Sequence, residues 1–203
     1  MSNTIQSQAL YESVYSDKLG EDRQIKILLP RGYTNDNEKK YPLIIVMDGD
    51  YLFEAVAGNV DYYSYWEDIP EAIVVGIKQA DQRFDDSLYS EQNSLPIEKG
   101  ADFFEFVGME LIPYINEKFK TEEFRVAVGH GETANFINYY LLKDKPLFQA
   151  YISISPDLAP DVTQYLTERF ERLESKIFYY LATSTEDVKQ IKTKVDALNT
   201  SLK

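Results

Sequence analysis

Two continuous apolar runs constrain the fold of this chain most strongly, Leu43-Ile44-Ile45-Val46-Met47 and Ile73-Val74-Val75-Gly76-Ile77. A run without polar alternation is typical of a strand buried on both faces, as in a parallel sheet covered by helices. Two further strand-like runs, Tyr151–Ser155 and Ile177–Leu181, follow in the second half of the chain. The four runs therefore indicate a sheet at the centre of an α/β protein.

Helical patterns separate these strand-like runs. The apolar spacing from Asp102 to Lys120 predicts a helix that Pro113 kinks. Other helices are predicted over Tyr51–Trp66 (with a loop at its end), Thr133–Leu142, Asp161–Leu173 and Val188–Leu202. By contrast, Lys78–Lys99 has no sustained period and predicts a long irregular loop.

The N-terminal part reads differently, because Tyr11–Tyr15 and Arg23–Leu29 are β-rich runs that flank the turn-like segment Asp17–Asp22. This pattern predicts an antiparallel hairpin. Strands that alternate with helices after such a hairpin predict a mostly parallel, doubly wound sheet. We therefore expect a single α/β domain over residues 1–203.

Composition narrows the classes of partner and cofactor. Lys and Arg total 21 against 34 Asp and Glu, and the net charge of −13 disfavours nucleic acid and anionic membrane surfaces as partners. No apolar run is long enough to cross a bilayer, so we expect a soluble protein, either cytoplasmic or exported with its leader removed. The chain has no Cys and one His, so neither a Cys-based nor a His-rich metal site is available. We expect no metal and no cofactor.

The segment from Arg125 to Asn135 reads as a strand, a sharp turn and a helix. Its centre, Gly129-His130-Gly131-Glu132-Thr133, partly matches the G-x-S-x-G nucleophile elbow of α/β-hydrolases. Gly131 stands at the place of the serine, and Thr133 at the place of the second glycine. An ordinary strand-to-helix turn is the alternative interpretation of this segment.

Segments on both sides of the elbow resemble the "putative esterase" family of α/β-hydrolases, which includes enterochelin esterases and S-formylglutathione hydrolases. The resemblance runs from about Tyr15 to about Asp187 and implies the α/β-hydrolase fold and a serine esterase ancestry. The matching pieces, in family order, are S-x-x-L-G-x-x-R and L-P-x-G-Y (Ser16–Tyr33), Y-P-L-I-I-V-M-D-G (Tyr41–Gly49), I-V-V-G-I then R (Ile73–Arg83), F-F-x-F then E-L-I-P-Y-I (Phe103–Ile115), Arg125–Gly131, and L-F then S-P-x-L (Leu147–Leu158).

The resemblance also implies where a catalytic site would lie. Oxyanion donors would map to Gly49 or Asp50 and to Glu132, and the catalytic acid would be Glu186 or Asp187. A pocket is expected above Gly49, Gly131 and Pro156, beside Ser155. The family's last strand and catalytic histidine would fall beyond the closing helix, where this sequence has ended, so we expect a shortened or truncated form.

Departures from the family pattern weigh against ordinary catalysis. Gly131 has no side chain with which to attack an ester, and Glu132 places a negative charge beside the oxyanion position. His130, the single histidine, lies inside the elbow rather than on a distant loop. We expect its imidazole to pack under the elbow and bond to backbone, with a catalytic role as the alternative. Glu132 could instead serve as a general base for water.

Three other groups admit two interpretations each. Ser155-Pro156-Asp157 could form a displaced nucleophile and acid, or a turn that shapes the pocket. The acidic residues Asp48, Asp50, Asp81, Asp85 and Asp86 could bind calcium, although solvated acids are the default in so acidic a chain. The aromatic cluster Tyr62–Trp66 could stack on a ligand, or pack in the core and at its rim.

The first functional hypothesis is a non-catalytic homologue that binds an ester-like or anionic small molecule, or a partner protein. The rival is a hydrolase of carboxylic esters that works through a non-standard site, or an inactivated form of one. A purely structural module is the third. The sequence does not indicate the oligomeric state.

Overall fold

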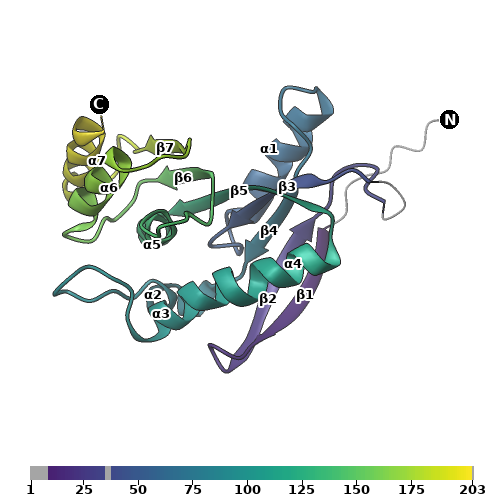
Figure 1. Cartoon of the computed structure of the whole chain (residues 1–203), viewed down its shortest axis with the longest axis horizontal. Coiled ribbons are helices and arrows are strands. Elements are labelled where there is room, and N and C mark those ends of the chain that lie inside the picture. Colours follow the sequence, from purple (N-terminus) through teal and green to yellow (C-terminus); the bar gives the residue numbers. More distant parts are fainter. Residues whose placement is uncertain (1–8, 35–37, 203) are drawn as a thin grey trace.

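The structure is a computed structural model of the chain, and it describes residues 9–34 and 38–202. Its centre is a seven-stranded mixed sheet with the strand order β1-β2-β4-β3-β5-β6-β7 (Figure 1). The strands are β1 (Ala9–Ser16), β2 (Glu21–Leu28), β3 (Tyr41–Val46), β4 (Ile73–Ile77), β5 (Thr121–His130), β6 (Ala150–Ile154) and β7 (Phe178–Ala182). Strands β1 and β2 run antiparallel to their neighbours, and β4, β3, β5, β6 and β7 are parallel. The α/β architecture predicted from the sequence is confirmed.

Helical segments cover both faces of this sheet. They are α1 (Phe53–Tyr65), the 3₁₀ turn η1 (Ala80–Gln82), α2 (Arg83–Asp86), α3 (Glu98–Glu105), the π-helical η2 (Phe106–Leu111), α4 (Ile112–Lys118), α5 (Glu132–Leu141), α6 (Val162–Glu171) and α7 (Lys189–Ser201). Helix α1 packs on one face, and the continuous run α3–η2–α4 packs with α5, α6 and α7 on the other (Figure 1).

Burial on both faces explains the two apolar runs. Leu43 and Ile45 of β3 join the core under α3–η2–α4 and α5, whereas Val46 joins the smaller core under α1. On β4, Ile73 and Val75 face the larger core. A strand with helices on both sides has no solvent face, so polar alternation is absent from its sequence.

The helix predicted to be kinked at Pro113 is irregular one turn earlier. Residues 106–111 wind as a π-helix, and the N–H of Ile112 donates to the carbonyl of Val107. Proline cannot donate a backbone hydrogen bond, and the wider turn that precedes it accommodates this loss. The loop predicted over Lys78–Lys99 contains the short segments η1 and α2 and a bridge between Tyr89 and Pro96.

After β7, the described chain contains α7 and no further strand. In the same described residues, no helix combines the length and the hydropathy that a membrane span requires.

Candidate functional site

The loops that follow β3, β4, β5, β6 and β7 meet at one edge of the sheet, because parallel strands share the direction of their carboxyl ends. This edge is where open α/β sheets bind ligands. It gathers Asp48, Asp50 and Tyr51 after β3, Arg83 after β4, His130 to Thr133 at the end of β5, Ser155 to Asp157 after β6, and Ser184 to Asp187 after β7.

Gly131 makes the sharp turn between β5 and α5. Its φ of 61° and ψ of −120° lie in a region that residues with a side chain rarely adopt, so glycine holds the turn without strain. Its N–H donates to the carbonyl of Ile154 at 3.0 Å, and its carbonyl accepts from the N–H groups of Asn135 and Asp157, each at 3.1 Å. These bonds fix the turn to β6 and to the start of α5.

Gly129 is required for the same turn by close approach. A β-carbon at this position would lie 2.6 Å from the carbonyl oxygen of Thr133, so the strand and the helix could not meet as they do. Thr133 itself is buried, and its hydroxyl donates to Asp48 Oδ2 at 2.5 Å while accepting from the N–H of His130 at 3.0 Å. The hydroxyl thus joins the turn to the loop after β3.

Arg83 lies directly over this turn. Its Nε donates to Asp48 Oδ1 at 2.6 Å, Nη1 donates to the Glu132 carboxylate, and Nη2 donates to the carbonyl of His130 at 2.6 Å. Burial disfavours the charged guanidinium and lowers its pKa. The nearby carboxylates of Asp48 and Glu132 have the larger, opposite effect, so the pKa of Arg83 is raised. Four hydrogen-bond partners in all, Tyr51 being the fourth, hold the guanidinium in place.

The guanidinium occupies the space that a residue-131 side chain would enter. A β-carbon built on Gly131 would lie 3.1 Å from Nη2 of Arg83, which is closer than most real β-carbon contacts. A side chain at this position would therefore require the guanidinium to shift by a few tenths of an ångström. Sequence reasoning missed this role of Arg83, although the residue was part of the resemblance to the esterase family.

His130 does not pack as expected. Its imidazole Nδ1 lies 3.0 Å from the hydroxyl of Tyr51, with the two rings edge to face, so it bonds to a side chain rather than to backbone. The expectation of a backbone-bonded imidazole under the elbow is wrong, because the loop after β3 brings the hydroxyl of Tyr51 within hydrogen-bond distance of the ring. Burial and the negative charge of Asp48 raise the pKa of Tyr51 to about 12, so its phenol is protonated at neutral pH.

The loop after β3 departs from the expected oxyanion geometry. The N–H of Gly49 donates to the carbonyl of Ile77 at 2.7 Å and is therefore not available to a ligand, which corrects the expectation for this residue. The Asp50 side chain accepts from the N–H groups of Gln79 and Ala80, each at 2.7 Å. Asp50 thus holds the segment that leads into Arg83.

A second polar cluster lies between the ends of β6 and β7. The buried Ser155 has a φ of 44°, and its hydroxyl donates to Asp187 Oδ2 at 2.6 Å. The N–H of Ser184 donates to the same oxygen at 2.8 Å. The Ser155 hydroxyl and then the Ser184 N–H hold the pKa of Asp187 below its usual value. Of the two acids that the resemblance left open, Asp187 makes these contacts, and the Glu186 side chain is exposed.

A cavity of about 380 Å³ opens beside the turn, between α2 and the start of α5. Its volume is within the usual range for small-molecule sites. Of the expected pocket residues only Glu132 lines it, together with Phe84, Ser87, Leu88, Tyr89, Glu91, Asn135 and Asp157. The buried Pro156 is not among them. Burial and the carboxylates of Asp157 and Glu91 raise the pKa of Tyr89, and no lysine or arginine lines the wall.

Several acidic residues considered for calcium are engaged elsewhere. Asp86 is fully buried and accepts from both terminal nitrogens of the buried Arg23, at 2.6 and 2.7 Å. Asp48 is bonded to Arg83 and Thr133. The default interpretation of solvated acids is therefore wrong for Asp48 and Asp86. Over residues 9–34 and 38–202, no cluster of three or more acidic or His side chains could hold a metal ion.

The aromatic cluster at the end of α1 is on the surface. The side chains of Tyr62, Tyr63, Tyr65 and Trp66 are all exposed and pack in pairs on one another, and Arg31 lies over the ring of Tyr65. The expectation that these rings pack in the core is wrong.

Comparisons with known proteins show the family and agree with the fold. Residues 16–195 match the family described as "Putative esterase", and the chain belongs to this family. The fold is that of an α/β-hydrolase esterase. A search of curated proteins found no significant match.

Solved structures agree with the fold. A protein of uncharacterised function from Capnocytophaga ochracea is similar at 30% identity and a TM-score of 0.87, over 96% of this chain and 54% of that protein. The chain thus spans about half the length of that relative. The BES protein from Bacillus cereus has 21% identity and a TM-score of 0.81, over 100% and 84% of the two chains. An IroE-like serine hydrolase from Shewanella oneidensis has 20% identity and a TM-score of 0.66, over 97% and 79%.

Proposed function

We propose that this chain is a non-catalytic member of the esterase family that acts by binding a small neutral or cationic molecule at the carboxyl edge of its sheet. The observation that carries the proposal is the position of Arg83, whose Nη2 lies 3.1 Å from the site of a β-carbon on Gly131. A guanidinium lies against the elbow at this position, and Gly131 itself offers no nucleophile. A histidine brought to this site from any other segment would still have no serine at the elbow to activate.

The charges around the turn also oppose ester hydrolysis. An oxyanion intermediate is stabilised by hydrogen-bond donors that point at the developing negative charge. Here the guanidinium is already bonded to two carboxylates, Asp48 and Glu132, and the N–H of Gly49 is bonded to Ile77. One guanidinium and two carboxylates give a net negative charge beside the start of α5, and this charge destabilises an oxyanion.

The expected loss of rate is large. In serine hydrolases, removal of the nucleophile or the base lowers the turnover rate by about 10⁶. The oxyanion hole and substrate binding still accelerate the reaction by about 10³ to 10⁴ over water. Because this site also lacks a free oxyanion donor at Gly49, we expect turnover at the background rate.

The cavity beside the turn supports a neutral or cationic ligand rather than an anionic one. Glu91, Glu132 and Asp157 line it without a lysine or arginine, so an anionic ligand would meet repulsion and a neutral ester-like or cationic molecule would not. Glu132 is paired with Arg83 and Asp157 with Lys194 at 3.1 Å, so among the described residues Glu91 is the lining carboxylate whose charge is not offset by an ion pair. The proposal keeps the ester-like ligand expected from the sequence and replaces the anionic ligand with a cationic one.

Two measurements test the proposal. Hydrolysis of a short-chain nitrophenyl ester by the wild type is expected to equal the buffer rate, and Glu132→Gln is expected to leave it unchanged. Thermal shifts with neutral, cationic and anionic small esters should then show stabilisation by neutral or cationic members alone. Turnover above buffer that Glu132→Gln abolishes would overturn the non-catalytic proposal.

A second candidate is a hydrolase that uses Ser155. It is favoured by the 2.6 Å bond between the Ser155 hydroxyl and Asp187. Against it, the lowered pKa of Asp187 makes this carboxylate a weak base, and the His130 imidazole bonds Tyr51 instead of Ser155. Ser155→Ala separates the two candidates, since only the hydrolase would lose ester turnover in this variant.

A further inference from the structure

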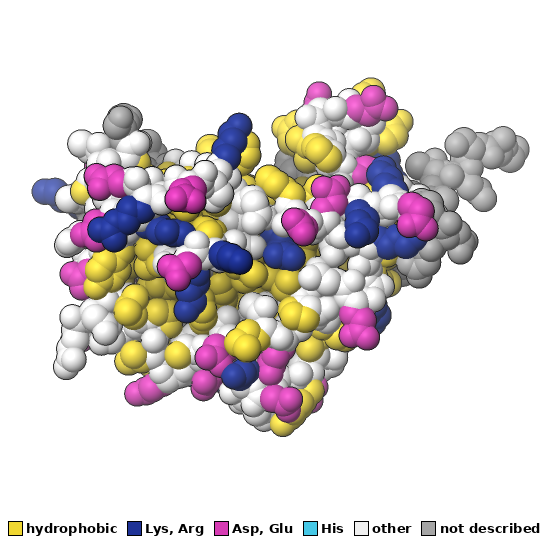
Figure 2. Space-filling view, in the orientation of Figure 1, with side chains coloured by type: hydrophobic (Ala, Val, Ile, Leu, Met, Phe, Trp, Pro, Cys, Tyr) yellow, Lys and Arg dark blue, Asp and Glu magenta, His cyan; other side chains and the backbone are white. Residues whose placement is uncertain are grey.

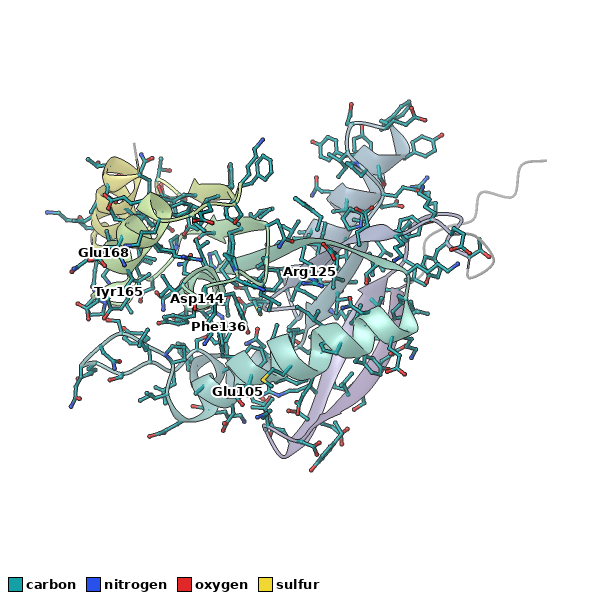
Figure 3. The ribbon with its side chains drawn as sticks, viewed as in Figure 1. Glu105, Arg125, Phe136, Asp144, Tyr165 and Glu168 are labelled. Atoms are coloured by element: carbon teal, nitrogen blue, oxygen red, sulfur yellow. The ribbon has the colours of Figure 1, made fainter. Side chains whose placement is uncertain are left out.

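A groove lies between the helical run α3–η2–α4 and the second half of α5, away from the strand-to-helix turn at the start of α5. Its volume is about 600 Å³, and its apolar wall includes Leu95, Pro96, Phe104, Met109 and Leu147. Hydrophobic side chains gather in a hollow over these elements, with basic side chains at its border (Figure 2). Glu105, which is labelled in Figure 3, lines the groove from α3.

The aromatic part of the wall is rigid. The rings of Phe104 and Tyr140 stack at 4.3 Å with an interplanar angle of 13°, and the Tyr140 hydroxyl donates to the carbonyl of Phe104 at 3.1 Å. This contact joins α3 to α5. The groove is therefore formed before any ligand arrives, which lowers the entropic cost of binding.

Gly108, which lies on the π-helical turn, leaves room in the groove. Gly108 lies on η2, and a β-carbon there would be 3.5 Å from Cδ2 of Leu147 and 4.0 Å from Cε1 of Tyr140. These are ordinary contacts, so no clash requires glycine at this position. The absence of a side chain leaves room in the groove instead. Single π-helical turns are frequent at functional sites.

The border of the groove carries two lysines without acidic partners. Lys143 lies over the ring of Phe104 at 5.2 Å, and Lys145 lines the same border. Across the part of the chain that the structure describes, neither forms an ion pair with a carboxylate, Asp144 included. The one acidic lining residue, Glu105, is paired with Lys18 at 2.5 Å. In a chain with a net charge of −13, this border is locally basic.

The turn that carries both lysines is fixed from below. Arg169 of α6 donates from Nη2 to the carbonyls of Lys143 and Asp144, at 2.6 and 2.9 Å, and from Nε to the carbonyl of Leu141 at 3.0 Å. The backbone of the turn is thus held in place, so both lysine side chains start from a fixed segment at the border of the groove.

We propose that this groove binds an amphiphile with a linear apolar chain and one anionic head group, such as a medium-chain carboxylate. The chain lies against Phe104, Met109 and Leu147, and the carboxylate lies beside Lys143 and Lys145. Apolar burial supplies the affinity, and the two ammonium groups select the head group. The site is independent of the proposed function at the sheet edge.

Calorimetric titration of the full chain with three octyl compounds tests the inference. Octanoate is expected to bind about tenfold more tightly than 1-octanol, and octyltrimethylammonium more weakly than either. Absence of octanoate binding, or tighter binding of the cation, would overturn the proposal. So would a dimer that Gly108→Leu abolishes, because the groove would then be an interface between two copies.

Charge-reversal variants locate the head group. Both lysines are exposed, and the double variant Lys143→Glu, Lys145→Glu should lower the affinity for octanoate by about tenfold. Its affinity for 1-octanol should change by less than about twofold. Lys176→Glu with Lys189→Glu is the matched control, because both lysines are exposed elsewhere and the net charge changes equally. Equal weakening by the control would show a non-specific charge effect and contradict the proposal.

A groove-filling variant locates the apolar chain. The β-carbon of Gly108→Leu meets only ordinary contacts, and the rest of the side chain is expected to extend into the groove. Circular dichroism and thermal unfolding verify that the variant folds. Octanoate and 1-octanol should both lose measurable binding in this variant. Retained binding of both in a folded Gly108→Leu protein would place the site elsewhere. If this variant does not fold, the affinities of the lysine variants for octanoate decide whether the proposal stands.

Discussion

Nη2 of Arg83 lies 3.1 Å from the position that a β-carbon on Gly131 would occupy. The arginine and the glycine are complementary: the first fills the space that the second leaves. The guanidinium is also bonded to Asp48, Glu132 and the carbonyl of His130, so it draws three loops together at the edge of the sheet. A serine at residue 131 would therefore meet both a strained backbone conformation and a close contact with Arg83.

Gly131→Ala should lower the free energy of unfolding by about 1–3 kcal/mol, because alanine is strained at a φ of 61° and its β-carbon presses on Arg83. Part of this cost should disappear in an Arg83→Ala background, which leaves the backbone strain alone. Urea unfolding of the four proteins in this cycle measures both effects.

Gly58→Ala is the matched control for that cycle. Gly58 lies on α1 with no heavy atom within 4 Å of its would-be β-carbon, so this change should stabilise the protein by about 0.5–1 kcal/mol. Strict additivity of Gly131→Ala and Arg83→Ala would show that the arginine does not press on residue 131.

Asp86→Ala should destabilise the protein by about 3–5 kcal/mol, because it leaves the buried guanidinium of Arg23 without its bidentate partner. Asp86 ends the short helix that Arg83 begins, so the loop above the turn should loosen as well. Chemical denaturation gives the free energy, and hydrogen exchange of residues 79–88 reports the loop.

Arg172→Ala serves as the comparison for the buried pair. Arg172 and Glu168 are exposed and 4.0 Å apart, so loss of this pair should cost less than about 0.5 kcal/mol. Equal losses from Asp86→Ala and Arg172→Ala would contradict the importance given to burial.

The pairing of Asp187 with Ser155 should appear in the pH dependence of stability. The folded-state pKa of Asp187 lies below its unfolded value, so the ionised carboxylate stabilises the fold above the unfolded pKa. This contribution is lost as the pH falls through the folded pKa. The difference in Tm between the wild type and Asp187→Asn should therefore be constant near neutral pH and shrink in acid.

Glu186→Gln provides the control for the acid titration, because the side chain next to Asp187 is exposed. It should change Tm little at any pH. A Tm difference for Asp187→Asn that grows as the pH falls would refute the sign of the linkage.

Much of the fold follows from the sequence because its signals are local. The apolar runs at Leu43–Met47 and Ile73–Ile77 identify strands with helices on both faces, and the two runs around Asp17–Asp22 identify the hairpin. The π-helical turn before Pro113 does not follow, since a proline signals an irregularity without stating which turn absorbs it.

The site follows from the sequence only in part. Gly131 is identified by its place in a motif, and the structure gives it the positive φ that makes glycine suitable. The position of the Arg83 guanidinium depends on partners 35 to 49 residues away, on loops whose meeting the sequence does not specify. The choice between Glu186 and Asp187 likewise depends on Ser155, which reaches Asp187 only in the folded chain.

Covalent labelling tests most directly whether this edge of the sheet holds an activated nucleophile. The wild-type protein is incubated with a fluorophosphonate that reacts with activated serines, and its intact mass is measured. We expect no stoichiometric adduct, because Gly131 offers no hydroxyl and the Ser155 hydroxyl donates its hydrogen bond to a weakly basic carboxylate. A single adduct at this edge, lost in Ser155→Ala, would show that the protein is a working hydrolase.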